Sequence, residues 1–291
     1  MQYFVSAENS SYFYWQLELL IESFIMQGLE KSLVIALAEN DDQKIMGYSY
    51  NLVKHEKKFM MSNEGRQVGY LPINRINAIR NLLDHGVLEL PFAIIHADMI
   101  LRTPLQLSEQ EEQCGLVMNN FNESEQDDAR VKEETDPMAE RIAEEKEIGS
   151  KDMPRIPFFS YPAVFNKPME YVAEPFFSNV HMYESKLLTD RGPGFPCERC
   201  AWEMGVTECF QHFSVSGKLM SVPMMYDGEA TNFIHYKSGI PPVFHKKYFK
   251  YENGNYFSAA GPYETIMEHN PTQNTNYVHQ VIRSYNRRHN R

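Results

Sequence analysis

The stretch PFAIIHADMILRTPL, residues 91–105, places one acidic side chain between two apolar segments. Apolar residues 92–95 lead into His96-Ala97-Asp98, and the apolar chain resumes at residue 99. A carboxylate flanked by apolar chain costs free energy unless a partner holds it. Taken alone, Asp98 could be a helix N-cap, a turn residue or a metal ligand. The segments on either side narrow the choice.

The surrounding chain predicts an alternation of strands and helices. Short runs rich in apolar and β-branched residues predict strands at residues 2–6, 32–38 and 92–96, and apolar spacing predicts helices at residues 12–28 and 74–85. Gly28 and Gly86 are suitable helix ends. This order predicts an α/β fold, in which ligands bind beyond the carboxyl ends of parallel strands. Asp98 follows one such end and Ser6 and Ala7 follow another, so the two places could face one crevice.

Composition bounds the class of protein. The 291 residues are 43% hydrophobic and 13% aromatic, which supports a packed core and excludes global disorder. Four cysteines do not make a disulfide framework, and the first residues, MQYFVSAENSSYF, lack the pattern of a signal peptide. No apolar run reaches the roughly 18 residues that cross a bilayer. We therefore expect a cytoplasmic protein with no membrane partner.

The net charge of −11 is unevenly distributed. Residues 123–147 hold eleven Asp/Glu against four Lys/Arg, and a helix is predicted at residues 137–148, between Asp136 and Gly149. No acidic residue follows Glu268, whereas the end of the chain is rich in arginine. That basic end is either a solvated terminus or a contact for a polyanion.

Three blocks of sequence carry a family resemblance. HADMILRTPL, residues 96–105, resembles the acid-containing signature of GT-A glycosyltransferases, usually Asp-x-Asp followed by an apolar run and Pro-Leu. More closely, the chain resembles the hydroxyproline O-arabinosyltransferase and peptidyl serine galactosyltransferase group. The matching blocks are residues 5–20, residues 74–105, and residues 205–216 followed by FIHYK at residues 233–237. They follow the family's order along the chain.

The resemblance implies a GT-A fold, a mixed sheet flanked by helices. Its nucleotide-sugar-binding half would be residues 1–107, followed by an acidic, partly mobile insertion at residues 108–152. The acceptor-side half would be residues 153–291, which starts with a Pro- and aromatic-rich segment typical of a loop-rich layer. The implied activity is transfer of a sugar, a pentose such as arabinose or a hexose, from a nucleotide sugar, in the first place a UDP-sugar, to a hydroxyl group.

The resemblance also implies site residues. Asp98 and His235 would bind a divalent cation, Mn²⁺ or Mg²⁺. His96 stands where many GT-A enzymes have their first acid, and could support the metal indirectly, contact the nucleotide or be a simple polar replacement. Further donor contacts are expected from Ser6, Ala7, Tyr12, Arg75 and Lys237, with Arg80 as a second choice to Arg75. Trp15, close to Tyr12, is more typical of a core residue.

A carboxylate is expected near the sugar carbon, because that carbon becomes cation-like as the glycosidic bond breaks. Besides Asp98, the resemblance indicates Glu208 in VTECF as the first candidate. Glu203 in AWEMG is the second, and Asp227 is a weaker third. In an inverting enzyme this carboxylate would also accept the acceptor's proton.

A second constellation lies in the same region. Cys197 and Cys200, then Cys209 and His212, form two close pairs of soft ligands that are typical of a structural Zn²⁺ site. Alternatively, Cys209 and His212 are incidental members of the helix that carries Glu208. The two interpretations are compatible, because a zinc ion could fix that helix.

The acceptor is open. Family members of this group work on hydroxyl-bearing peptides in the secretory pathway, whereas a cytoplasmic enzyme from a bacterium or a virus would need a cytosolic hydroxyl. The basic end of the chain suggests a hydroxymethylated pyrimidine in viral DNA. Peptide serine, hydroxyproline or a glycan are alternatives. So are two other classes, a non-catalytic protein that binds nucleotide sugars and a zinc-organised nucleic-acid-binding protein.

Overall fold

The fold was determined as a computed structural model. It describes residues 1–8, 11–38, 52–55, 59–61, 67–69, 71–119, 161–170, 173–191, 201–202, 205–206, 213–216, 219–221, 231–235, 239–240, 244–245 and 273–289. The predicted helix at residues 137–148 lies outside these ranges, as does most of the predicted insertion.

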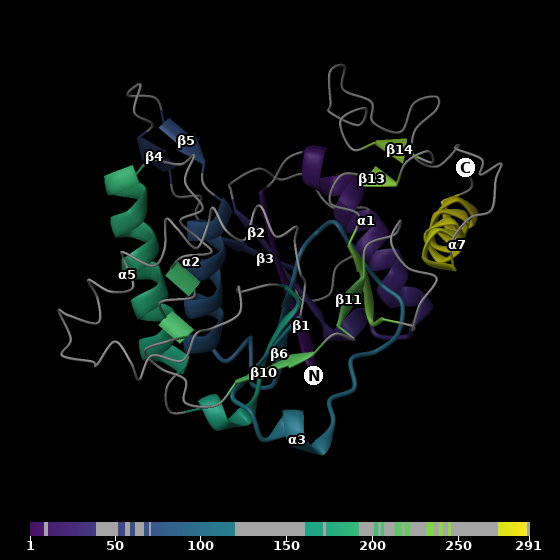
Figure 1. Ribbon diagram of the computed structural model, residues 1–291. Coiled ribbons are helices and arrows are strands. Elements are labelled where there is room, and N and C mark those ends of the chain that lie inside the picture. The colour runs from purple at the N-terminus through teal and green to yellow at the C-terminus, as the bar shows by residue number, and fades with distance from the viewer. Residues whose placement is uncertain are drawn as a thin grey trace.

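A seven-stranded mixed sheet forms the centre of the molecule (Figure 1). Its strands are β1 (Gln2–Glu8), β2 (Leu33–Ala38), β3 (Leu52–His55), β6 (Phe92–Ile95), β8 (Leu116–Asn119), β9 (Ala163–Phe165) and β10 (Phe213–Ser216). Their order in space is β3-β2-β1-β6-β9-β8-β10. Of these seven strands, β9 alone runs antiparallel to its neighbours. The predicted α/β fold with a mixed sheet is therefore confirmed.

The topology changes direction beside β1. From β1 the chain adds β2 and then β3 on one side, and afterwards adds β6 on the other side of β1. In open α/β sheets the crevice at such a point, beyond the carboxyl ends of the strands, is the usual place for a ligand. The carboxyl ends concerned are those of β1, at Glu8, and β6, at Ile95.

Helices cover both faces of this sheet. On one face lies α1 (Ser11–Met26), and on the other lie α2 (Leu71–Asp84) and α5 (Ala173–Arg191), which pack against each other (Figure 1). The predicted helices at residues 12–28 and 74–85 are α1 and α2, and they end before Gly28 and Gly86, whose φ angles are +67° and +64°. Only glycine adopts these angles without strain, which explains both ends.

The core between these layers is aromatic. Phe92 of β6 stacks on Phe165 of β9 with ring centroids 5.3 Å apart, and Phe165 contacts Phe177 of α5 at 5.2 Å. On the other face, Tyr3 of β1 meets Phe24 of α1 edge to face at 5.0 Å. Successive side chains of a strand point to opposite faces of the sheet, so each strand packs against the helices on both faces.

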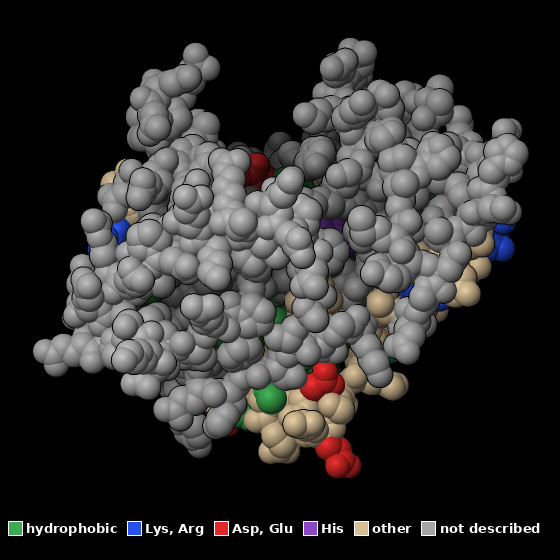
Figure 2. Space-filling model, viewed as in Figure 1, with side chains coloured by type: hydrophobic (Ala, Val, Ile, Leu, Met, Phe, Trp, Pro, Cys, Tyr) green, Lys and Arg blue, Asp and Glu red, His purple; other side chains and the backbone are tan. Residues whose placement is uncertain are grey.

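Smaller elements complete the described fold. A three-stranded sheet has the order β11 (Met220–Ser221), β12 (Phe233–His235) and β7 (Met99–Leu101). Two hairpin-like pairs are β4 (Phe59–Met61) with β5 (Gln67–Gly69), and β13 (Gly239–Ile240) with β14 (Phe244–His245). Short helices are η1 (Glu30–Ser32), α3 (Glu109–Glu112) and η2 (Lys167–Met169). The acidic side chains of α3 project at the lower edge of Figure 2.

One prediction is wrong for the described part of the Pro- and aromatic-rich segment. Residues 163–165 are not loop but strand β9, fully buried in the central sheet between β6 and β8. The 19-residue helix α5 follows. The proline at position 162 precedes the strand, where its missing N–H costs no ladder hydrogen bond.

The interpretation of the chain end as a solvated terminus is also wrong for residues 273–289. They form α7 (Gln273–Arg288), an amphipathic helix that packs on the outer side of α1 (Figure 1). Its apolar face is buried through Val278, Val281, Ile282 and Tyr285. Within the described residues, no helix combines the length and the apolar character needed to cross a bilayer.

Candidate metal centre

The three-stranded sheet brings His235 to Asp98. Asp98 is followed directly by β7, and β7 pairs antiparallel with β12 in a register that sets Met99 opposite His235. The start of β7 therefore meets the end of β12, although 137 positions separate Asp98 and His235 along the chain. The family resemblance implied both residues for one site, and the structure places them side by side.

Three ligand-type side chains converge here. The Nε2 atom of His235 lies 3.2 Å from Oδ1 of Asp98, and Nδ1 of His96 lies 3.9 Å from the same oxygen. One potential ligand atom from each of the three residues lies within 4.8 Å of the others. The Asp98 and His235 side chains are only 13% exposed, and His96 is 28% exposed. The three side chains are therefore mostly buried, and His96 is the most exposed of them.

The cluster fits a divalent cation. An octahedral ion with bonds of about 2.1 Å sets adjacent ligands about 3.0 Å apart and opposite ligands about 4.2 Å apart. The observed 3.2 and 3.9 Å separations lie in this range. Although His235 Nε2 is close to Asp98, the pair lacks the geometry of a hydrogen bond, and the nitrogen is buried without such a partner among the described residues. A cation bound between the three side chains would satisfy this nitrogen.

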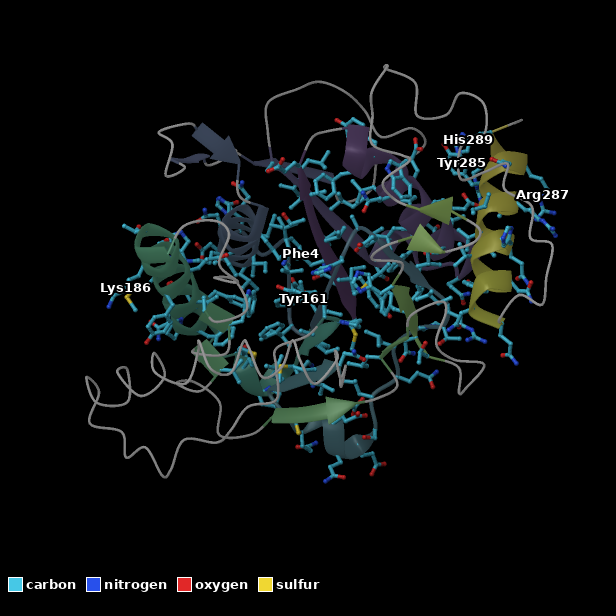
Figure 3. The ribbon with its side chains drawn as sticks, turned by 45° about the horizontal axis from the view of Figure 1, so that its top comes forward. Phe4, Tyr161, Lys186, Tyr285, Arg287 and His289 are labelled. Atoms are coloured by element: carbon cyan, nitrogen blue, oxygen red, sulfur yellow. The ribbon has the colours of Figure 1, made fainter. Side chains whose placement is uncertain are left out.

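His96 is held by an aromatic neighbour. The registers of β6 and β9 continue so that His96 lies opposite Tyr161, and the two rings are 4.3 Å apart with an interplanar angle of 47°. The Tyr161 hydroxyl accepts a 2.8 Å hydrogen bond from Nη1 of Arg75, whose guanidinium also lies 4.9 Å from the Tyr161 ring centre. Arg75 is 4% exposed. Figure 3 shows Tyr161 at the centre of the molecule, between the two groups of flanking helices.

The residues predicted for the nucleotide lie at the same edge. Val5 of β1 pairs with Ile95 of β6. The same register sets the next residue of β1, Ser6, opposite His96. The Ser6 hydroxyl oxygen is buried and has no hydrogen-bond partner among the described residues. Ala7 is fully buried beside it. An orphaned hydroxyl at a ligand-binding edge is what a missing polar ligand would satisfy.

Several predicted residues have other surroundings. Arg80 lies farther along α2 and forms a 3.5 Å ion pair with Glu174 of α5. Trp15 is buried in the core, as its residue type predicted. The side chain of Tyr12 is not described. Also outside the described residues are the candidate carboxylates Glu203, Glu208 and Asp227, the predicted donor contact Lys237, and the predicted zinc ligands Cys197, Cys200, Cys209 and His212.

Sequence reasoning missed two polar side chains at this edge. Tyr161 was hidden in the segment that was expected to be loop. Asn119 ends β8, and its backbone N–H donates to the carbonyl of Pro162 (3.2 Å). Its amide group is buried and has no hydrogen-bond partner among the described residues. The available signal in the sequence was an asparagine at the end of an apolar run, and Asp98 stands out by a similar position.

No protein-family model matches the sequence, and neither does any curated protein. Some solved structures are similar in fold. The bifunctional glycosyltransferase WbbM has a TM-score of 0.43 and 11% identity over 84% of this chain and 46% of WbbM. The galactosyltransferase LgtC has a TM-score of 0.45 and 8% identity over 81% of this chain and 87% of LgtC. For mouse xyloside xylosyltransferase 1 the values are 0.42 and 10%, over 81% and 97%. The chain thus spans less than half of WbbM.

Proposed function

We propose that this chain is a metal-dependent glycosyltransferase of the GT-A type, which transfers a sugar from a nucleotide sugar to a hydroxyl acceptor. One observation carries the proposal. His96, Asp98 and His235 converge beyond the carboxyl end of β6, beside the point where the strand order changes direction. The sequence blocks that resemble the arabinosyl- and galactosyltransferase group support it, because two of them supply these three residues.

The chemistry follows from the donor's charge. A nucleotide sugar leaves behind a diphosphate, and negative charge grows on it as the glycosidic bond breaks. A divalent cation, when bound, offsets that charge as a Lewis acid. Asp98, His235 and His96 would hold the cation at the edge of the sheet. Ser6 would donate a hydrogen bond from its hydroxyl to the nucleotide, while Arg75 would hold Tyr161 and thereby His96 in place.

We assign the remaining steps to residues outside the described ranges. Lys237 follows β12 by two positions, so it is proposed to approach the diphosphate from the side of His235. Glu208 is proposed to stabilise the cation-like sugar carbon and, in an inverting reaction, to take the proton of the acceptor hydroxyl. Glu203 is the alternative for that role. UDP is the proposed nucleotide.

The experiment is a thermal-shift panel of UDP-sugars with and without Mn²⁺, followed by donor hydrolysis. A ligand that binds the native state raises the melting temperature by mass action. Asp98→Asn should remove the Mn²⁺-dependent shift and lower donor turnover by about 100-fold or more, because several kcal/mol of charge stabilisation are lost. Asp84→Asn changes an exposed acid at the end of α2 in the same way and should retain both. Unaltered turnover in Asp98→Asn contradicts the proposal.

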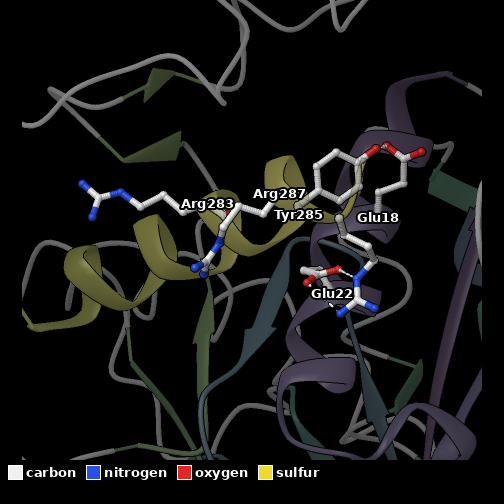
Figure 4. A network of polar contacts seen from close by, with 6 residues as sticks. Glu18, Glu22, Arg283, Tyr285 and Arg287 are labelled. Atoms are coloured by element: carbon white, nitrogen blue, oxygen red, sulfur yellow. Dashed lines mark hydrogen bonds and ion pairs between the residues drawn. The ribbon is translucent and has the colours of Figure 1, made fainter. Parts of the chain in front are cut away.

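The acceptor is proposed to be a hydroxymethylated pyrimidine in DNA, on the strength of the basic chain end. In α7, Arg283 and Arg287 are exposed and directed away from α1, whereas Arg288 is engaged with Glu22 (Figure 4). If DNA lies along this helix, charge reversal at the two exposed arginines weakens DNA binding and its salt dependence. A transferase that uses peptide serine, hydroxyproline or a glycan would be indifferent to that change.

Two alternative classes predict different outcomes. A protein that kept the site but lost catalysis binds a UDP-sugar with Mn²⁺ and does not hydrolyse or transfer it. A zinc-organised nucleic-acid-binding protein contains stoichiometric Zn²⁺, loses it when Cys197 and Cys200 become serine, and binds DNA without a nucleotide sugar. Metal analysis of the purified chain separates the second class from the transferase.

A further inference from the structure

The candidate metal centre depends on a very short strand pair. β7 and β12 are three residues long, and their antiparallel pairing brings His235 beside Asp98. Strands this short need packing against further elements to be stable. The separation of the two side chains therefore depends on what fixes the far end of the pair, where β7 ends at Leu101 and β12 begins at Phe233.

The far end of β7 is held by two helices. β7 is the edge strand of the described three-stranded sheet, so one side of its backbone has no neighbouring strand. Buried backbone groups on such a side need other partners. At the fully buried Leu101, the N–H donates to the Ser23 hydroxyl of α1 at 3.0 Å, and the carbonyl accepts a hydrogen bond from the Tyr277 hydroxyl of α7 at 3.1 Å. These two side chains take the place of a further strand at the last residue of β7.

The Tyr277 hydroxyl belongs to a connected set of polar contacts. Gln27, after α1, donates to this hydroxyl and to the Arg102 carbonyl, both at 2.9 Å. The Arg102 side chain donates to Asn274 of α7 at 2.7 Å. The Arg102 backbone N–H donates to the carbonyl of Asn232, the residue before β12, at 2.8 Å. These contacts join α1, α7, the end of β7 and the start of β12.

Tyr277 keeps the proton that it donates. Burial raises the pKa of its hydroxyl above the ordinary value, and the hydrogen bond from Gln27 and the positive charge of Arg102 offset only part of that effect. The hydroxyl is therefore a hydrogen-bond donor throughout the neutral pH range. Replacing Tyr277 by Phe removes this donor and keeps the ring.

We propose that Tyr277 is a positioning residue of the candidate metal centre. Its hydroxyl holds the carbonyl of Leu101, three positions from Asp98, and so keeps β7 in the place that brings Asp98 to His235. A small divalent cation with bonds of about 2.1 Å tolerates little change in the separation of its ligands. The inference rests on the metal site of the proposed function but not on sugar transfer. It gives α7 a part in metal affinity.

The test measures binding of Mn²⁺ alone to the full chain, through the loss of the free Mn²⁺ signal in electron paramagnetic resonance. The variant is Tyr277→Phe. The matched control is Tyr285→Phe, eight positions further along α7. It removes the same atom, but that hydroxyl donates to Glu18 of α1 at 3.0 Å and not to β7 (Figure 4). Comparing the two variants separates the hydroxyl at the end of β7 from the docking of α7 in general.

We expect Tyr277→Phe to raise the Kd of Mn²⁺ by about tenfold, the lower end of the range for residues that hold metal ligands in place. Tyr285→Phe should leave this Kd unchanged. It should nevertheless lower the melting temperature at least as much, because it removes a donor from the buried Glu18 carboxylate. Gln27→Met, which removes the donor to both Tyr277 and Arg102, should also raise the Kd, and it serves as the second variant should Tyr277→Phe fold poorly.

Failure of this inference differs from failure of the proposed function. Equal Kd values for the wild type and Tyr277→Phe overturn the positioning role and leave the transferase standing. An equal rise in Tyr277→Phe and Tyr285→Phe overturns it as well, because α7 then acts only by stabilising the fold. The absence of Mn²⁺ binding to the wild type also overturns it, and donor turnover, measured separately, decides the proposed function. A rise confined to Tyr277→Phe, with no turnover of any nucleotide sugar by the wild type, upholds the positioning role and refutes the transferase.

Discussion

The ion pair between Arg288 of α7 and Glu22 of α1 should contribute more to the free energy of unfolding than the exposure of Arg288 suggests. Nε and Nη2 of Arg288 donate to the two carboxylate oxygens of Glu22 at 2.9 and 3.2 Å (Figure 4). Glu22 is 2% exposed, whereas Arg288 is 47% exposed. Arg288→Met therefore leaves a buried carboxylate without its cation, but Glu22→Met leaves a cation that water can still reach.

This asymmetry sets the magnitudes. Breaking a fully buried pair costs about 3–5 kcal/mol, and exposed pairs contribute about 1 kcal/mol or less. Because half of Arg288 is solvated, we expect Arg288→Met to lower the free energy of unfolding by about 2 kcal/mol, which corresponds to a melting temperature lower by about 4 °C. Glu22→Met should cost under about 1 kcal/mol, and the double variant should approach the wild type, because neither charge is then left unpaired.

Urea unfolding followed by circular dichroism measures these values, and the four proteins form a double-mutant cycle. The control is Arg287→Met at the adjacent position of α7. The Arg287 side chain is exposed, and among the described residues its Nε donates only to the carbonyl of Arg283. It should change stability by less than about 0.5 kcal/mol. A larger loss for Glu22→Met than for Arg288→Met, or a double variant weaker than both single variants, refutes the reasoning.

Three further predictions concern the site and the outer helix. Asp98→Asn should abolish Mn²⁺ binding yet shift the melting temperature of the metal-free protein little, since asparagine has nearly the same shape as aspartate; calorimetry without metal checks this. Tyr161→Phe keeps the ring against His96 and should preserve the Kd of Mn²⁺ within about threefold, whereas Tyr161→Leu should raise it about tenfold; equal effects would show that the ring does not position His96. Burial and the nearby Arg283 charge lower the pKa of His279. The unfolded chain then binds the proton first as the pH falls below about 6.5, so acid destabilises the fold, and His279→Gln should reduce that slope in pH-dependent unfolding.

The elements that could be predicted from the sequence are those with a strong local pattern. The strands predicted at residues 32–38 and 92–96 are dominated by apolar residues, and the predicted helices that became α1 and α2 end before glycines that the structure shows at positive φ. These features depend on neighbours within a few positions of the chain, so they are visible without knowledge of the fold. The position of Asp98 after a strand end was visible for the same reason, but its role as a metal ligand was implied by the family resemblance.

Strand β9 could not be recognised in this way. It has three residues between a proline and a short 3₁₀ helix, and its side chains are buried because β6 and β8 flank it. No alternation develops over three residues, and aromatic residues next to prolines are common in loops. The missed contact between Tyr161 and His96 is a direct consequence, since only the register of β9 places the two rings together.

The support behind the metal centre depends on contacts that no local pattern reveals. Gln27, after α1, donates both to the carbonyl of Arg102 (2.9 Å) and to the hydroxyl of Tyr277 in α7, 250 positions away. Tyr277 in turn donates to the carbonyl of Leu101 (3.1 Å), and Arg102 donates to Asn274 (2.7 Å). Leu101 is the last residue of β7, the strand that begins directly after Asp98, and Arg102 follows it. The first part of α7, in a segment that looks like a solvated tail in the sequence, therefore contacts the end of β7 through Asn274 and Tyr277. Because β7 is only three residues long, these contacts at its last residue lie close to Asp98 and to the strand pairing that brings His235 to it.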